Sequence, residues 1–227
     1  MKTDILALLF TVLISANLPA QSSPQREETA NNTQSKSFVV PQGKGQQVVI
    51  DGKFSKGEWE DAVSFPVAAG FDLHVKADSQ ALYIGLKSAA PSAVIGCEIR
   101  YTENDKDVRL LHVSARLAEG LSGFPARGKF EIGNTGWESN LIVENQAKLT
   151  AWQAAGRPIE QYREVVEKGD GKEFRISRKI LTGNRIKFTI GWMELAADGR
   201  KTFNYPEDAS FQNADNWVEL ILPPPTK

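Results

Sequence analysis

The chain has 227 residues, of which 41% are hydrophobic, and its formal net charge is -1. This is enough apolar material for one globular domain with a buried core. The 27 Lys and Arg residues are balanced by 28 Asp and Glu residues. No excess positive charge is available to bind phosphates, which argues against nucleic acids and anionic membranes as partners. A small neutral or weakly charged ligand fits this composition better.

The first 20 residues predict a signal peptide. Lys2 precedes an apolar run over residues 5–16, and Ala20 offers a small residue at which signal peptidase can cut. The run is shorter than the roughly 20 residues that cross a bilayer, which disfavours a membrane anchor. Cys97 is the only cysteine, so the chain has neither an internal disulfide nor a lipid-attachment cysteine after the cleavage site. We expect a secreted or periplasmic protein that begins near Gln21 and has no membrane span.

Residues 21–45 predict a disordered linker. The segment consists mainly of polar residues, with Phe38 as its only aromatic residue, and it offers too little apolar surface to offset the entropy lost on ordering. Asn31 begins a glycosylation sequon, Asn-Asn-Thr, which matters only in a host that glycosylates exported proteins. The folded domain is expected over residues 46–222, followed by a short tail over residues 223–227.

The sequence of this domain predicts an all-β fold. Apolar and polar residues alternate over residues 71–77, 82–86, 95–101 and 108–115, with polar turns between them. Further strands are expected at 137–145, 149–154, 163–167, 173–180, 185–192 and 217–222. The sequence Gly-Asp-Gly at 169–171 predicts a hairpin turn. Only residues 56–62 suggest a helical turn, so the fold class predicted is an antiparallel β-sandwich of about ten strands.

Two segments resemble a known family. The first runs from Val48 through Ile50-Asp51-Gly52 to a turn that carries Glu58-Trp59, and it resembles the opening of the family 9 carbohydrate-binding modules and their DOMON-like relatives. In that opening, Gly52 tolerates a positive φ and Trp59 can fold back as an apolar plug over the sandwich. The second segment, residues 82–86, follows a polar turn and is similar to the family's Leu-Tyr-Val/Ile strand.

The resemblance implies a jelly-roll-like sandwich that binds a mono- or oligosaccharide. Family members are usually attached to glycoside hydrolases, so it also implies an accessory role in carbohydrate catabolism. Any hydrolysis of O-glycosyl compounds would then come from a partner enzyme.

The five tryptophans are candidates for stacking on a sugar ring. Trp59 and Trp192 are predicted to lie in the core, and Trp217 is predicted to be partly exposed. Trp137 and Trp152 adjoin loop-forming sequences, so we expect them to clamp a ring, the alternative being that either packs beneath its loop. The predicted polar helpers for the sugar hydroxyls are Glu138, Asn140, Gln153 and Arg157.

The resemblance also suggests structural calcium in an acidic loop, as the one cofactor to consider. Asn104, Asp105 and Asp107 could supply its oxygen ligands. The alternative is that these residues simply form a turn, which is the commoner role of such Asp and Asn runs.

Residues suited to catalysis are few. His74 is expected on the outward face of its strand, whereas the alternation around His112 does not decide which face it occupies. The two histidines lack a metal-binding spacing, and the sequence has no nucleophile-elbow motif. Cys97 falls on the same strand face as Ile95 and Ile99, which predicts a buried thiol rather than a nucleophile. We therefore expect a binding protein without a catalytic site of its own. Two alternatives stay open: a haem-binding electron-transfer protein of DOMON type, with Met193 as a ligand, and a structural surface or adhesion sandwich.

Overall fold

The computed structural model describes residues 37–92, 94–114, 117–126, 128–140, 143–158, 168–196 and 199–224. The predicted signal peptide and the strand expected at 163–167 lie outside this part of the chain. Within it, no helix is both long and apolar enough to cross a membrane.

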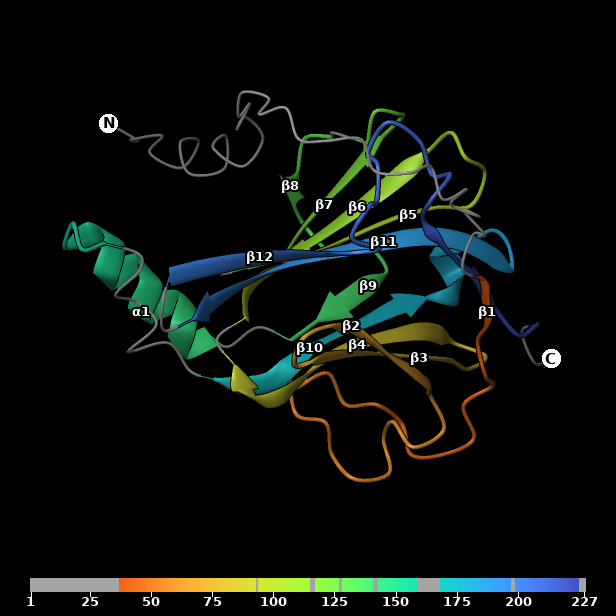
Figure 1. Cartoon of the computed structure of the whole chain (residues 1–227), viewed down its shortest axis with the longest axis horizontal. Helices are drawn as coiled ribbons and strands as arrows, with labels where there is room; N and C mark the ends of the chain where they lie inside the picture. The colour runs from red at the N-terminus through yellow and green to blue at the C-terminus, as the bar shows by residue number, and fades with distance from the viewer. Residues whose placement is uncertain are drawn as a thin grey trace, which may run out of the picture. The chain divides into compact units, whose positions relative to one another are not determined.

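The described residues form two sheets packed face to face (Figure 1). The first sheet has the order β1-β13-β11-β5-β6-β7-β8, and β12 also pairs with β11. Its strands are β1 (Ser37–Val39), β5 (Val94–Thr102), β6 (Val108–Val113), β7 (Leu117–Ser122), β8 (Glu131–Ile132), β11 (Arg185–Ala196), β12 (Gly199–Tyr205) and β13 (Val218–Ile221). The second sheet has the order β2-β3-β4-β10-β9. Its strands are β2 (Val63–Ala68), β3 (Phe71–Ala77), β4 (Ala81–Ser92), β9 (Trp137–Ser139) and β10 (Gly169–Ser177).

The core lies between the inner faces of the two sheets. Alternate residues of the central strands point inward, as Leu73 and Val75 of β3 and Ile99 of β5 do. Across the core, β10 contacts β5 and β4 contacts β11. Apart from the parallel pair β1–β13, the described strand pairs are antiparallel. The predicted all-β antiparallel sandwich is confirmed.

The outer faces are also partly covered. Residues 48–62 lie over the second sheet, where Val48 and Trp59 pack on Tyr83. Over the first sheet, Trp217 packs on Val108 and Leu110 and is 0% exposed. The prediction that Trp217 is partly exposed is wrong, because a second apolar cluster covers the outer face to which it points. The predicted burial of Trp59 and Trp192 is confirmed.

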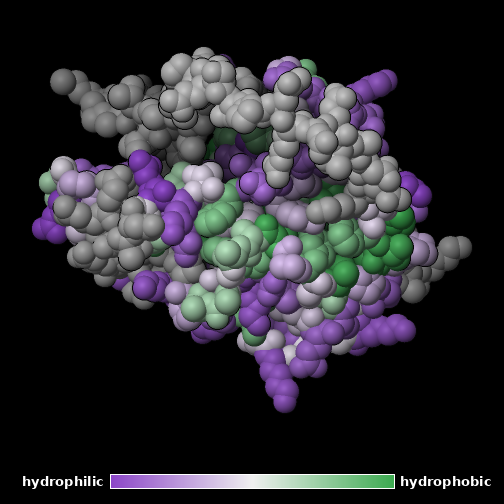
Figure 2. Space-filling view, viewed as in Figure 1, coloured by the Kyte–Doolittle hydropathy of each residue, from purple (hydrophilic) through white to green (hydrophobic). Residues whose placement is uncertain are grey.

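The open edge of the sandwich carries apolar side chains. Figure 2 shows a band of hydrophobic residues between the two sheets in this view, with hydrophilic residues above and below it. Phe38 of β1 stacks on Phe65 of β2, with ring centroids 4.5 Å apart, so aromatic contacts join the two sheets near this edge.

A helix replaces part of the predicted sheet. Residues 143–154, expected as the end of one strand and the whole of another, form the helix α1 (Val143–Ala154). The segment is rich in Ala, Gln, Lys, Leu and Glu, which favour helix, and this preference overrides the short alternation. Gly156, at φ 65°, ends it as a left-handed cap residue.

Several other features of the fold also differ from expectation. Gly169-Asp170-Gly171 does not form a hairpin but begins β10, with a bulge against β4. A Cβ at Gly171 would lie 1.8 Å from the carbonyl oxygen of Leu86, so this close approach is what requires glycine there. The folded domain also starts earlier than residue 46, because β1 pairs with β13 and Val40 is buried. The strands β2, β7, β8 and β12 were not predicted.

Candidate functional site

A polar pocket lies beside the turn between β3 and β4, where residues 43–48 cross the outer side of the second sheet. Its volume is about 170 Å³, which equals the space of about five or six water molecules in the liquid. The side chains that define it are Gln46, Gln47, Lys76, Asp78, Gln80 and Tyr83.

Lys76 forms the floor of the pocket. Its side chain is buried, and its Nζ donates to the carbonyl oxygens of Gln46 (3.0 Å) and Glu58 and to Asp61 Oδ1 (2.9 Å). These three bonds use all three N–H groups of the ammonium. Lys76 therefore fixes the segment that walls the pocket and has no further hydrogen bond to donate to a ligand.

Asp61 locks the same segment from the other side. Its Oδ2 accepts hydrogen bonds from the backbone N–H groups of Lys44 (2.7 Å) and Gly45 (2.6 Å). Burial raises the pKa of Asp61, but the bonds from Lys76 and from these N–H groups outweigh it, and the net pKa lies below its ordinary value. The ionised carboxylate thus holds residues 44 and 45 in place.

Tyr83 and Asp78 form a second rigid wall. The Tyr83 hydroxyl donates to Asp78 Oδ2 at 3.0 Å. Asp78 Oδ1 accepts from the N–H groups of Gln80 (2.7 Å) and Ala81 (2.8 Å), which closes the turn between the strands. Burial raises the pKa of Tyr83, so its hydroxyl stays protonated near neutral pH.

The rim differs from the floor. Gln46, Gln47 and Gln80 are exposed, and their amide side chains make no hydrogen bond among the described residues. Each amide offers two N–H donors and a carbonyl acceptor. A sugar hydroxyl both donates and accepts, so three uncommitted amides above a fixed floor match a small neutral polyhydroxylated ligand.

Glu173 anchors the neighbouring segment to the second sheet. It is 0% exposed and accepts from the N–H of Gly52 (2.8 Å), the N–H of Asp51 (3.1 Å) and Trp59 Nε1 (3.1 Å). Burial raises the pKa of Glu173 to about 7 despite these three bonds. Trp59 in turn lies against Gly85, where a Cβ would come within 2.9 Å of the indole ring.

Trp137 does not offer a ring face to a ligand. It begins β9, points between the sheets and is 1% exposed, and its Nε1 donates to Glu119 Oε2 at 2.8 Å. The alternation of β9 places it opposite Ile176 on the core side. The expectation that the loop before it leaves Trp137 accessible is therefore wrong, and packing explains this residue.

Trp152, Gln153 and Arg157 belong to α1 and the turn that follows it. Trp152 is half-buried, its Nε1 donates to the carbonyl of Pro158 at 2.9 Å, and the Arg157 guanidinium lies over its ring at 4.8 Å. Gln153 and Arg157 are exposed. Figure 1 shows α1 projecting from one end of the sandwich, away from β9. A clamp between Trp137 and Trp152 is therefore not formed, while a role for the α1 residues in binding stays a prediction.

The remaining predicted helpers have structural partners. Glu138 pairs with Arg175 at 3.1 Å on the outer face of the second sheet. Asn140 is buried, its Oδ1 accepts from the N–H of Glu173 at 2.8 Å, and its Nδ2 donates to the carbonyl of Gly171 at 3.3 Å. Asn140 thus satisfies backbone groups at the bulge of β10.

The turn at residues 104–107 does not fit a calcium ion. Asn104 Oδ1 accepts from the N–H groups of Lys106 and Asp107, both at 2.9 Å, and Asp105 pairs with the Lys187 ammonium at 2.8 Å. An ammonium at that carboxylate competes with any cation, so the turn alternative explains Asn104, Asp105 and Asp107. Nowhere in the described ranges do three or more His, Cys, Asp or Glu gather as metal ligands.

The residues do not fit a haem held by His and Met either. His74 lies between core residues of β3 and so faces outward from the second sheet. Met193 follows the core residue Trp192 and faces outward from the first sheet. Two groups on opposite outer faces of a sandwich cannot ligate one iron, and both ring nitrogens of His112 are within hydrogen-bonding distance of Glu98 and Ser114.

Comparison with known proteins gives structural neighbours only. No family profile and no curated protein matches the chain. Among solved structures, the chain is similar to a family 9 carbohydrate-binding module from Caldicellulosiruptor kristjanssonii in complex with cellotriose, with 16% identity, a TM-score of 0.44, and coverage of 82% of this chain and 93% of that chain. It is also similar to a Bacteroides uniformis protein provisionally described as carbohydrate-binding, with 10% identity, a TM-score of 0.47, and coverage of 84% of this chain and 100% of that chain.

Proposed function

We propose that this protein binds a mono- or oligosaccharide in the polar pocket beside the β3–β4 turn. The observation that carries the proposal is the contrast within the pocket: the polar groups of the floor are hydrogen-bonded, while the three rim amides make no hydrogen bond to the part of the chain that the structure describes. A rigid floor limits the ordering cost of binding, and the free amides supply the hydrogen bonds that orient a polyhydroxylated ligand.

The two segments that resemble the family 9 modules meet at this pocket, which supports the proposal. Val48, from the opening segment, and Tyr83, from the second segment, both line it. Glu173 and Lys76 hold the opening segment on the sheet. The residues that carry the resemblance thus build the pocket wall, although the tryptophans expected to bind the sugar lie elsewhere.

We further propose that the mature protein acts outside the cytoplasm, as an accessory to a separate glycoside hydrolase. The apolar run at residues 5–16 and the cleavage position after Ala20 support export. The accessory role follows from the resemblance. Protein recovered from the extracytoplasmic fraction should begin near Gln21, and recovery with Met1 intact would contradict export.

The binding proposal is tested with a glycan array probed by the mature protein, with cellotriose and other short oligosaccharides included. The parent protein should bind at least one glycan, and the Gln47→Leu/Gln80→Leu variant should lose that signal. Gln212→Leu is the matched control, because it removes an exposed glutamine next to Phe211, which packs in the Trp217 cluster over the first sheet, whereas the pocket lies over the second sheet. If Trp152→Ala abolishes binding while the pocket variant keeps it, the sugar binds at α1. If no glycan binds, the binding proposal is wrong, and the structural or adhesion alternative gains support.

A further inference from the structure

A serine, a histidine and a glutamate form a hydrogen-bonded relay on the outer face of the first sheet. His112 of β6 alternates with the core residues Leu111 and Val113, so its ring points outward. Glu98 is its direct cross-strand partner on β5, and Ser114 follows two residues later on the same side. Ser114 Oγ lies 3.0 Å from His112 Nε2, and His112 Nδ1 lies 3.2 Å from Glu98 Oε1.

The relay fixes the tautomer of the imidazole. An ionised carboxylate only accepts hydrogen bonds, so Nδ1 of His112 must carry the proton that it donates to Glu98. In the neutral ring Nε2 is then the acceptor, and the hydroxyl of Ser114 donates to it. This is the arrangement in which a histidine can take a proton from a serine, with the carboxylate orienting the ring.

Arg100 keeps the carboxylate ionised. Burial raises the pKa of Glu98, but the hydrogen bond from His112 and the charge of Arg100 outweigh burial, and the net pKa lies below its ordinary value. The Arg100 guanidinium contacts Glu98 Oε2 at 2.5 Å, and the Phe211 ring lies over it at 4.2 Å. Glu98 is therefore held on two sides, by His112 and by Arg100.

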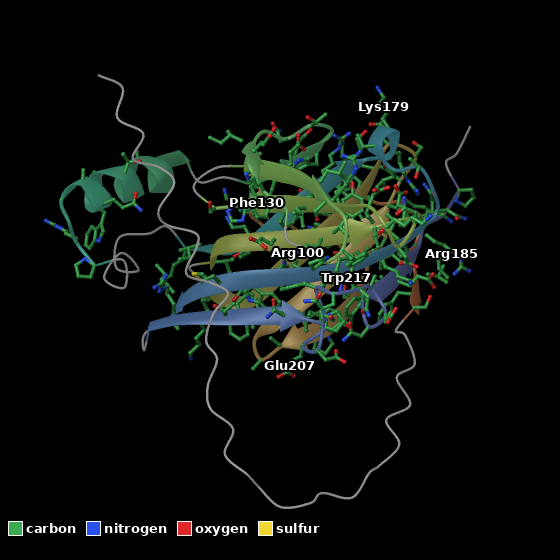
Figure 3. All side chains as sticks on the ribbon, turned by 90° about the horizontal axis from the view of Figure 1, so that it is seen from above. Arg100, Phe130, Lys179, Arg185, Glu207 and Trp217 are labelled. Carbon is green, nitrogen blue, oxygen red and sulfur yellow. The ribbon has the colours of Figure 1, made fainter. Side chains whose placement is uncertain are left out.

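Exposed apolar side chains flank the relay. The ring of Phe130 lies 5.2 Å from that of His112 and is 38% exposed. Ile132, 70% exposed, lies in register with His112 through Ala118 of β7 and so shares its face. Ser114 is itself half-buried. Figure 3 looks onto this face, with Phe130 and Arg100 labelled over the strands.

We propose that Ser114, His112 and Glu98 form an acyl-transfer centre that hydrolyses esters of short apolar acyl groups, with Phe130 and Ile132 contacting the acyl chain. Ser114 Oγ forms a bond to the carbonyl carbon while its proton passes to His112 Nε2. The bond from that carbon to the alkoxy oxygen of the ester then breaks, and this oxygen takes the proton from Nε2 and leaves as the alcohol. A water molecule repeats the two steps on the acyl-serine and releases the carboxylic acid. The reaction does not depend on the proposed sugar binding, which lies over the other sheet.

The chain supplies its own control for this proposal. Ser64 Oγ lies 2.6 Å from His74 Nδ1 on the second sheet, so a second serine contacts a second histidine. The other ring nitrogen of His74 is buried and has no hydrogen-bond partner in the part of the chain that the structure describes. No carboxylate orients that ring, so Ser64 should be inert where Ser114 reacts.

The test is covalent labelling of the purified chain with a fluorophosphonate, in which a serine oxygen displaces fluoride from phosphorus. Intact mass should show one adduct, and peptide mapping should place it on Ser114. Hydrolysis of p-nitrophenyl butyrate should fall about 10²-fold or more in Ser114→Ala and in His112→Gln, and remain unchanged in Ser64→Ala. Glu98→Gln, which removes a positioning residue, should lower kcat and leave KM unchanged.

Labelling of the parent protein needs no variant, so a folding defect in Ser114→Ala would not obscure the result. Melting curves followed by circular dichroism identify any such defect. An unlabelled parent chain, or an adduct that persists in Ser114→Ala, would overturn the proposal.

Discussion

Trp59 should hold the opening segment on the second sheet through two separable interactions. Its ring packs beside Phe54, at a centroid distance of 5.4 Å, and fills the space over Gly85. Its Nε1 donates to the buried carboxylate of Glu173 at 3.1 Å. Trp59→Phe removes the hydrogen bond and keeps an aromatic ring, whereas Trp59→Ala removes both.

The two substitutions should therefore differ in size. A hydrogen bond to a charged group contributes about 1.5–3 kcal/mol, which is the loss expected for Trp59→Phe at pH 8, where Glu173 is mostly ionised. Truncation of a buried aromatic residue to Ala costs about 3–5 kcal/mol. With a urea m-value of about 2 kcal/mol/M, the Ala variant should lower the unfolding midpoint by roughly 1.5–2.5 M.

Urea unfolding followed by tryptophan fluorescence and by circular dichroism measures both variants. Trp152→Ala is the control, because this half-buried tryptophan lies on α1, and its loss should cost less than about 1 kcal/mol. A midpoint that hardly moves in Trp59→Ala would show that the ring does not hold the opening segment on the sheet, and an equal loss in the Phe and Ala variants would show that its packing contributes nothing beyond the hydrogen bond.

Three further predictions concern Glu173, the β10 bulge and the core. The pKa of Glu173 is raised from 4.5 to about 7 in the folded protein, so protonation favours folding: its contribution is complete below about pH 4.5 and is lost as the pH rises through about 7. Urea midpoints measured across this window should fall with pH in the parent protein and vary less in Glu173→Gln. Gly171→Ala should destabilise the domain by about 1–3 kcal/mol through its contact with Leu86, whereas Gly96→Ala, whose Cβ would come no closer than 3.9 Å to its nearest neighbour, should melt like the parent. Trp192→Ala should cost about 3–5 kcal/mol, and a melting curve like the parent's would contradict its place in the core.

The fold could be predicted largely from the alternation of apolar and polar residues. The inward residues of β3, β4, β5 and β6 follow a period of two, and all four strands were expected, although β4 continues to Ser92 where only residues 82–86 were predicted. The helix α1 was missed because its hydrophobic periodicity is weak and because short runs favour either structure. Strand β1 was missed because its three residues acquire their partner only from β13, which lies some 180 residues later.

The candidate sites depended on contacts that no local pattern contains. Loop-forming residues before Trp137 suggested exposure, but the register of β9 with β10 turns its ring into the core. Gln46 and Gln80 carry no motif, and only the crossing of residues 43–48 over the β3–β4 turn brings them together. Glu98 and His112 likewise meet through strand pairing. Two histidines with no characteristic spacing therefore gave no signal for the relay.

Calorimetric titration of the mature protein with the best glycan from the array measures whether a sugar binds in the polar pocket. Loss of the amides in Gln47→Leu/Gln80→Leu should weaken binding by about 1–3 kcal/mol, a roughly 5- to 150-fold rise in Kd. The melting temperature should stay near that of the parent, because both side chains are exposed, and Gln212→Leu should bind like the parent. A pocket variant that binds the glycan with the parent's Kd would show that the sugar does not bind in this pocket.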